Sequence, residues 1–371
     1  MSQVSDTLIV LATATTGTAV LTPVVRFVAF KVGAVVAPDE RRVHERPTAT
    51  LGGTAMFLAF LAAFAVASRL ESFEQVFTRS SEPLGVIVGA TIIYLVGAID
   101  DLRPVSAPAK LAGQVLAASA LYLLGVTLFF VRVPFGGLWG LSPDIIPLIT
   151  VIWVVVMANA INVIDGLDGL AAGIVAIAAG AFYLYSQELL DAGLISQANG
   201  GPLIALVAFG CCLGFLPHNF HPARIFMGDS GALLLGLLMA SSTMSVGGRV
   251  VDQFSGQVFF FFAPMVIPVV VLGVPLFDSV WAAVRRARSG APVTQADKNH
   301  LHHRLMRLGH GHRRSVLILW GWTALLSGVV LYPTVTGDGD GIVPFAVAAL
   351  GLLLYTMFSR GLRGTPTQDA A

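Results

Sequence analysis

Long apolar runs alternate with short polar segments along almost the whole chain. A helix needs about 20 mostly apolar residues to cross the hydrocarbon core of a bilayer. The segments that approach this length are residues 8–30, 51–68, 84–99, 109–131, 145–163, 169–186, 202–217, 230–246, 258–280, 315–333 and 342–359. The pattern predicts an all-α integral membrane protein with about 11 transmembrane helices, folded as a single polytopic membrane domain over residues 1–371.

The pattern does not decide the local structure in two parts of the chain. Only a connector that carries glycine and aspartate separates 145–163 from 169–186, so one kinked helix there would change the number of spans. The apolar flanks of Gly136 and Gly137, within residues 131–141, are typical of a short β-hairpin, although the neighbouring proline disfavours strand pairing.

If these segments cross a membrane one after another, most of the basic residues fall on one side of it. With the N-terminus outside, the inner segments hold 17 of the 22 Lys and Arg residues and the outer segments hold four. Cytoplasmic loops are enriched in Lys and Arg, so we predict an outside N-terminus and a cytoplasmic C-terminus. All eight histidines then fall inside, as does the loop 281–314, which places the expected active site at the cytoplasmic face. Outer acidic residues such as Glu82 are expected to be solvated loop charges.

The composition supports a membrane protein and excludes other classes. Apolar residues make up 56% of the chain and charged residues only 12%, against about 25% in soluble domains. The net charge of +1 gives no reason to expect a nucleic-acid partner. Cys211 and Cys212 are adjacent inside an apolar run, which is typical of core packing rather than of a disulfide or a zinc site.

Acidic and amide residues cluster at the inner ends of two predicted helices. Asp100 and Asp101 follow an apolar run, where acidic side chains oppose the helix dipole and repel each other unless a cation lies nearby. A solvated helix end is the alternative. Further along, four polar residues recur at every third position: Asn159, Asn162, Asp165 and Asp168. This spacing predicts a polar stripe, which is costly at the end of a bilayer helix unless it is paired or functional.

Two later clusters carry basic groups. Asp229 precedes an apolar run and, taken alone, is slightly better explained as a helix N-cap. With Arg224, flanking glycines and free backbone N–H groups, the same segment also suits a phosphate or a phosphate-bound metal. The last inner loop carries His300, His302, His303 and Arg304 without the cysteines or HExxH motif that would indicate zinc. Imidazoles with arginine suit diphosphate oxygens, and the oxygen-rich carboxylate and amide set favours Mg²⁺ or Mn²⁺.

In type and order, these motifs resemble those of the polyprenyl-phosphate N-acetylhexosamine-1-phosphate transferases. The resemblance rests on Asp100-Asp101, the run from Asn159 to Leu170, residues 226–231 and residues 300–305. It implies a multi-pass enzyme of the bacterial inner (plasma) membrane, with which a homodimer is compatible. Such an enzyme joins a UDP-activated amino sugar to polyprenyl phosphate, releases UMP and uses Mg²⁺, with Mn²⁺ as a substitute.

The resemblance also implies roles for the matching residues. The catalytic set would comprise Asp100, Asp101, Asp165 and Asp168. Asp100 would deprotonate or orient the lipid phosphate, and Asp165 and Asp168 would act on the nucleotide side. The metal would be held by Asp229 and Asn162. Substrate contacts would come from Asn159, Asn219, Phe226, His300, His302, His303, Arg304 and the loosely aligned Arg46.

Two branches of that family differ in the last inner loop. The peptidoglycan branch takes UDP-MurNAc-pentapeptide and shows three consecutive histidines, whereas Leu301 interrupts the histidines here. The sequence is therefore similar to the UDP-GlcNAc branch, which makes GlcNAc-diphospho-polyprenol (undecaprenyl or decaprenyl) and UMP in the first membrane step of a cell-wall or surface polysaccharide. The stretch 292–296 lacks the phenylalanine usual in that branch, which keeps the pentapeptide enzyme as the alternative. UDP-GalNAc is not distinguished from UDP-GlcNAc.

Two other classes fit less well. A secondary transporter would place polar residues near the bilayer midplane with repeat symmetry, but here they cluster at the inner ends. A CDP-alcohol phosphotransferase would need a D-G-x-x-A-R motif, whereas Asp165-Gly166 continues as Leu-Asp-Gly. Direct attack by the lipid phosphate and a two-step route through an aspartate nucleophile both remain open.

Overall fold

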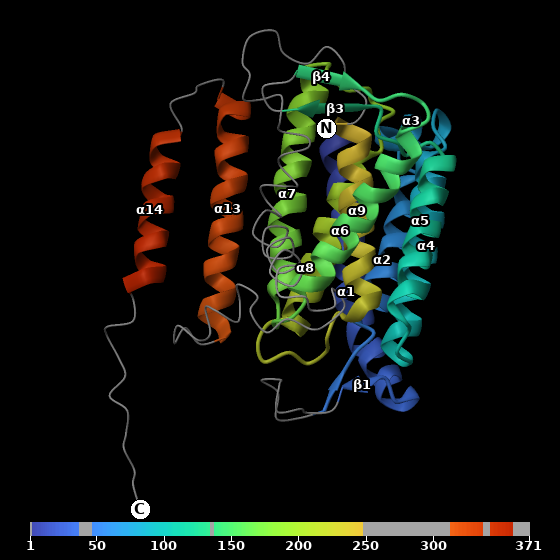
Figure 1. Ribbon diagram of the computed structural model, residues 1–371, viewed down its shortest axis with the longest axis vertical. Coiled ribbons are helices and arrows are strands. Elements are labelled where there is room, and N and C mark those ends of the chain that lie inside the picture. Colours follow the sequence, from blue (N-terminus) through green and yellow to red (C-terminus); the bar gives the residue numbers. More distant parts are fainter. Residues whose placement is uncertain (1, 37–46, 134–136, 248–311, 337–341, 359–371) are drawn as a thin grey trace, which may run out of the picture.

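The computed structural model describes residues 2–36, 47–133, 137–247, 312–336 and 342–358, whose helices stand side by side (Figure 1). The helices are α1 (Ser2–Val32), α2 (Gly52–Ala67), α3 (Glu74–Thr78), α4 (Glu82–Leu102), α5 (Ala107–Leu123), α6 (Ile146–Ile164), α7 (Leu170–Asp191), α8 (Gly201–Asn219), α9 (Gly228–Gly247), α13 (His312–Thr336) and α14 (Ile342–Phe358), with a 3₁₀ turn at Glu71–Phe73. Two antiparallel pairs join β1 (Val35–Val36) to β2 (Thr48–Ala49), and β3 (Phe130–Val133) to β4 (Gly137–Gly140).

Hydropathy located most of these helices. Ten of the eleven predicted segments contain a helix, and the eleventh, 258–280, lies outside the described residues. Among the described helices, α1, α4, α6, α7, α8 and α9 are long and apolar enough to cross a membrane. A seventh candidate is α2 taken together with residues 71–78, which bend away from it by 98°. The protein is therefore an all-α integral membrane protein, and the full number of spans stays a prediction.

The region after α5 differs from the predicted helix 109–131. α5 ends at Leu123, the chain turns at Gly125 with a φ of +96°, and β3 begins at Phe130. Glycine adopts positive φ without steric strain, so the turn forms inside an apolar stretch that hydropathy alone cannot divide. The hairpin predicted for 131–141 is confirmed by the β3–β4 pair, and α6 and α7 are two separate helices.

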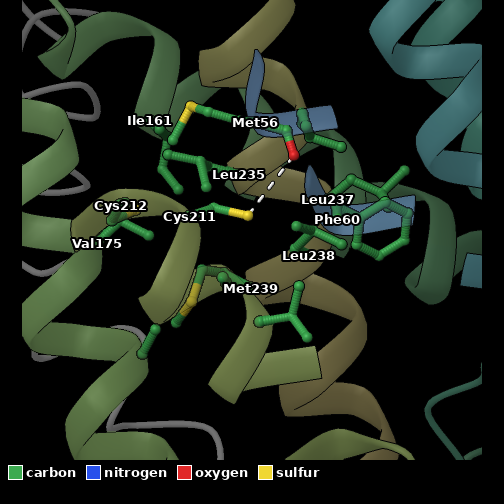
Figure 2. Packing of buried hydrophobic residues seen from close by; sticks show 14 of the residues in the cluster. Met56, Phe60, Ile161, Val175, Cys211, Cys212, Leu235, Leu237, Leu238 and Met239 are labelled. Carbon is green, nitrogen blue, oxygen red and sulfur yellow. Dashed lines mark hydrogen bonds between the residues drawn. The ribbon is translucent and has the colours of Figure 1, made fainter. Parts of the chain in front are cut away.

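The central helix of the bundle is α9, which contacts α2, α4, α6 and α8. Small residues along it let neighbouring membrane helices approach closely. A Cβ added at Gly236 would lie 2.4 Å from the Cα of Ala158 on α6, so no side chain fits there. Figure 2 shows Met239 of α9 packed near Cys211, whose thiol donates to the carbonyl of Met56. Both cysteines are buried and free, as the sequence predicted.

The expectation that Glu82 is a solvated charge is wrong. Its side chain is buried at the start of α4, and its Oε2 accepts a hydrogen bond of 2.9 Å from the hydroxyl of Ser245. The Asn199 amide donates to the Ser245 carbonyl at 2.6 Å, and its Oδ1 accepts the N–H of Gly201. A buried carboxylate is tolerated when donors surround it, and this network joins α4, α8 and α9.

Two further helices extend the bundle at one side. α13 packs on α7, where a Cβ added at Gly173 would lie 1.9 Å from Cε2 of Trp320. α14 packs on α13 and forms the edge of the bundle in Figure 1. Val343, Val347 and Leu350 of α14 are exposed, as expected for side chains that face hydrocarbon.

Candidate active site

The polar motifs meet at one end of the bundle, the end at which β1 and β2 lie (Figure 1). They come from the end of α4, the end of α6 with the loop after it, and the loop that leads into α9. Helices that start at this end alternate with helices that finish here, so segments far apart in sequence become neighbours. Hydrogen bonds join Asp101 to the start of α9 and join Asp168 to the loop before α9 at Ala223.

Backbone contacts fix the position of the loop that leads into α9. The N–H groups of Gly52 and Gly53 donate to the carbonyls of Phe226 and Met227 at 3.0 and 2.9 Å. A Cβ added at Gly53 would lie 2.1 Å from the backbone nitrogen of Gly231, so only glycine allows this approach. The start of α2 and the start of α9 are thereby joined backbone to backbone.

Asp101 caps α9 from a different helix. Its carboxylate accepts the N–H groups of Asp229 (2.9 Å) and Ser230 (3.2 Å), and also the Ser230 hydroxyl (2.6 Å) and the Thr50 hydroxyl (3.4 Å). A carboxylate at a helix N-terminus is favoured by the helix dipole and by the unpaired N–H groups there. The sequence expectation that these N–H groups are free for a phosphate is therefore wrong at Asp229 and Ser230. Asp101 instead holds the turn that carries Asp229.

Asp229 is the second residue of α9 and not its N-cap, and its side chain forms an ion pair with Lys110. The same ammonium lies 3.1 Å from Oδ2 of Asp100, whose Oδ1 accepts the Val105 N–H at 2.6 Å. The three charged side chains are only 17% to 23% exposed. A single lysine is thus shared by two of the predicted site carboxylates, one from α4 and one from α9.

Sequence reasoning used Lys110 only as an orientation charge and missed this contact. One signal was available. Lys110 lies in the first turn of α5, where the helix dipole disfavours a cation. A lysine at a helix N-terminus close behind two aspartates therefore indicates an acidic partner in space.

Asp165 contributes a further negative charge. It follows the last residue of α6, is half-buried, and donates its backbone N–H to the carbonyl of Ile161. Burial, together with the negative charges of Asp101 and Asp168, raises the pKa of the Asp165 carboxyl well above its usual range. A divalent cation nearby would favour the ionised form, so the electrostatics and the oxygen donors at this end of the bundle fit one.

Asp168 lies in the loop after α6 and is buried. Its Oδ2 accepts hydrogen bonds from Nδ1 of His221 (2.8 Å) and from the N–H of Ala223 (3.0 Å). Its backbone N–H donates to Nε2 of His312 at 3.0 Å, and the two imidazole rings stack with centroids 4.3 Å apart. The sequence had indicated neither histidine as a partner of Asp168, since this contact joins residues 144 positions apart.

Both remaining asparagines of the predicted substrate set hold protein groups. Asn219 accepts the Gly169 N–H and donates to the Ile225 carbonyl, both at 3.0 Å. Asn159 donates to Oε1 of Gln114 on α5 at 2.6 Å. These amides position the loops after α6 and α8 and the α5–α6 contact, and substrate contact through them stays a prediction.

The other predicted residues divide into two groups. Phe226 and Asn162 are half-buried at the same end of the bundle. The rest of the predicted substrate set lies outside the described residues and comprises Arg46, His300, His302, His303 and Arg304. The loop 281–314 is described only from His312 onward.

A membrane-embedded helix bundle with carboxylates, amides and a lysine gathered at one end is the architecture of an integral membrane transferase. Residues 83–247 match glycosyl transferase family 4, and that range contains Asp100, Asp101, Lys110, Asp165 and Asp229. The chain belongs to glycosyl transferase family 4.

Its relatives include proteins named as polyprenyl-phosphate N-acetylglucosamine phosphotransferases. It is 41% identical to the decaprenyl-phosphate N-acetylglucosaminephosphotransferase of Mycobacterium tuberculosis over 82% of this chain and 76% of that protein. The protein of the same name from Mycolicibacterium smegmatis is 37% identical over 92% of this chain and 85% of its own length. A probable undecaprenyl-phosphate N-acetylglucosaminyl 1-phosphate transferase of Bacillus subtilis is 38% identical over 84% and 81%.

Proposed function

We propose that this protein transfers GlcNAc-1-phosphate from UDP-GlcNAc to a polyprenyl phosphate, giving GlcNAc-diphospho-polyprenol and UMP. The observation that carries the reaction type is the Asp100–Lys110–Asp229 cluster at one end of a membrane bundle. The donor and acceptor are supported by the activities for which its relatives are named, and this chain covers 76–85% of the length of those relatives. The reaction would begin the synthesis of a cell-wall or surface polysaccharide.

The acceptor needs charge neutralisation more than it needs a base. A phosphate monoester carries about −1.5 to −2 charges at pH 7, so its oxygen is already a nucleophile. That oxygen attacks the β-phosphorus of the donor, a new P–O bond forms, and the bond from the β-phosphorus to the bridging oxygen breaks to release UMP. Lys110 is placed to neutralise phosphate charge, and phosphoryl transfer depends mainly on such positioning and neutralisation.

Asp100 then acts by positioning. One of its oxygens accepts the Val105 N–H and the other pairs with Lys110. Both oxygens of this carboxylate are therefore already engaged by protein groups. The contacts therefore support Asp100 as the group that orients Lys110 toward the acceptor phosphate, in preference to proton abstraction.

A divalent cation is part of the proposal. Asp229 and Asn162 would hold Mg²⁺, or Mn²⁺ in its place, which would supply positive charge for the diphosphate during transfer. The support is the oxygen-rich donor set and the raised pKa of the Asp165 carboxyl, which reflects a surplus of negative charge and burial at this end. Asp101 keeps the first turn of α9 in place and so fixes where the Asp229 carboxylate lies.

The donor preference is tested by kinetics with one lipid acceptor. We expect kcat/KM for UDP-GlcNAc to exceed that for UDP-MurNAc-pentapeptide by more than about a hundredfold, because an unpaired peptide carboxylate or a steric clash costs several kcal/mol. The motivating feature is the interrupted histidine run at 300–304. Release of UMP is the measurement. A ratio near one, or a preference for the pentapeptide, would move the protein to the other branch with its chemistry unchanged.

The proposed location is a bacterial inner membrane, with the N-terminus outside and the C-terminus in the cytoplasm. The support is the concentration of Lys and Arg on the proposed inner segments. Ser106, before α5, and Ser196, after α7, are both exposed. In a variant with Cys211→Ala and Cys212→Ala, a membrane-impermeant thiol reagent applied to intact cells should label Ser196→Cys and leave Ser106→Cys unlabelled until the membrane is opened. Labelling of both without opening would contradict this orientation.

A further inference from the structure

Asp168 is held by histidines from two other parts of the chain, at two different atoms. His221, in the loop between α8 and α9, donates to its carboxylate, while His312, the first residue of α13, accepts its backbone N–H. Because the Asp168 side chain is only 4% exposed, its carboxylate depends on such protein donors rather than on water. The proposed catalytic mechanism assigns neither histidine a role.

The two rings have opposite hydrogen-bonding roles. Nε2 of His312 accepts a backbone N–H, so this nitrogen carries no proton and the ring is neutral with its proton on Nδ1. Nδ1 of His221 faces an oxygen of a carboxylate that also accepts the Ala223 N–H, and therefore donates. The ring planes lie within 21° of each other, so their nitrogen lone pairs run side by side instead of converging. This geometry indicates a hydrogen-bonded clamp, not a metal centre.

Two further contacts join α13 to the loop between α8 and α9. Nε of Arg313 donates to the His221 carbonyl at 3.1 Å, and the rings of Phe220 and Trp320 lie 5.7 Å apart. In the sequence, α13 directly follows the loop that carries His300 to Arg304. Contacts at His312 and Arg313 therefore connect the segment after that loop with the loop after α6.

We propose that His221 and His312 are positioning residues that fix Asp168 for the nucleotide part of the donor. The inference rests on the proposed function, because it takes Asp168 to act on the nucleotide side. The hydrogen bond from His221 fixes the orientation of the Asp168 carboxylate, and the hydrogen bond to His312 fixes the position of the Asp168 backbone. Hydrogen-bond partners that orient metal-binding residues change metal affinity by about 10- to 100-fold when they are removed, and we expect an effect of the same order on nucleotide affinity here.

The chain offers matched substitutions for each bond. His221→Asn keeps a donor near the Nδ1 position, and His312→Gln keeps an acceptor near the Nε2 position. His221→Leu and His312→Met remove the bond and leave comparable volume. UDP affinity is measured by titration calorimetry on the full-length protein, so the result does not depend on turnover. The thermal unfolding temperature of each variant shows whether the fold is kept.

We expect His221→Leu and His312→Met to weaken UDP binding at least tenfold, whereas His221→Asn and His312→Gln stay within about threefold of the wild type. In an Asp168→Asn background, His221→Leu should add little, because both changes act through one carboxylate. In turnover, KM for the donor should rise while KM for the lipid acceptor stays unchanged. Unchanged UDP affinity in both bond-removing variants would overturn the proposal, as would equal losses in the bond-keeping ones. A wild type that binds UDP but transfers no sugar phosphate would instead refute the proposed function alone.

Discussion

Asp229→Asn should lower turnover at least about a hundredfold, about 2.7 kcal/mol in activation free energy, while the protein still folds. The substitution keeps the shape of the side chain but removes the charge proposed to hold the metal. The Lys110–Asp229 ion pair is largely buried, but the asparagine amide oxygen can still accept a hydrogen bond from Lys110, so the fold should be kept. UMP release at several Mg²⁺ concentrations measures the loss, and Mn²⁺ binding followed by electron paramagnetic resonance reports the metal separately.

Asp191→Asn, at the exposed C-terminal end of α7, is the matched control and should leave both measurements unchanged. Asp100→Asn offers a contrast, because it should lose rate while it still binds the UDP-sugar, its proposed action being on the acceptor side. Retention of more than about a tenth of wild-type turnover by Asp229→Asn, a loss below about 1.4 kcal/mol, would show that Asp229 is not a principal ligand.

Lys110→Met should lower turnover by about 10²- to 10³-fold, the usual effect of removing a group that stabilises transition-state charge. In the absence of substrates the same variant should bind Mn²⁺ more tightly than the wild type. The reason is that Lys110 is the cation shared by Asp100 and Asp229, and without it their charges attract a divalent ion more strongly. Lys110→Arg keeps the charge and should not gain Mn²⁺ affinity.

The two measurements on Lys110→Met separate a site residue from an orientation signal. If the lysine only marks the cytoplasmic side, its loss should leave both turnover and Mn²⁺ affinity near the wild-type values. Lower turnover with unchanged Mn²⁺ affinity would instead contradict the shared ion pair as the reason for the effect.

The sequence predicted the helices because burial in hydrocarbon is a property of local composition. It failed where the same composition serves another conformation, as after Leu123, where apolar residues continue through a turn into β3. It also failed at Glu82, because the serine that donates to this carboxylate comes from α9 and the asparagine that holds the backbone of that serine comes from the loop before α8. Neither partner is visible from the local sequence.

For the candidate site, the sequence indicated which residues to consider but not the contacts between them. Spacing and residue type indicated Asp101 and Asp229 as candidates. The contact between them, however, joins residues 128 positions apart and uses a backbone N–H group. Side-chain patterns carry no information on such a contact. Lys110 was overlooked for a related reason, since one of its two partners, Asp229, lies on α9, far along the chain.

The close backbone contact between Gly53 and the start of α9 has a consequence for biogenesis. In a nascent chain α2 and α4 are made first, and the turn that they hold, at residues 228–231, is made more than a hundred residues later. Asp101 therefore leaves the ribosome long before the N–H groups that it caps exist. The site can be completed only when α9 enters between helices already in the membrane. A chain that ends at Asn219 therefore contains Asp100 and Asp101 but has no complete active site.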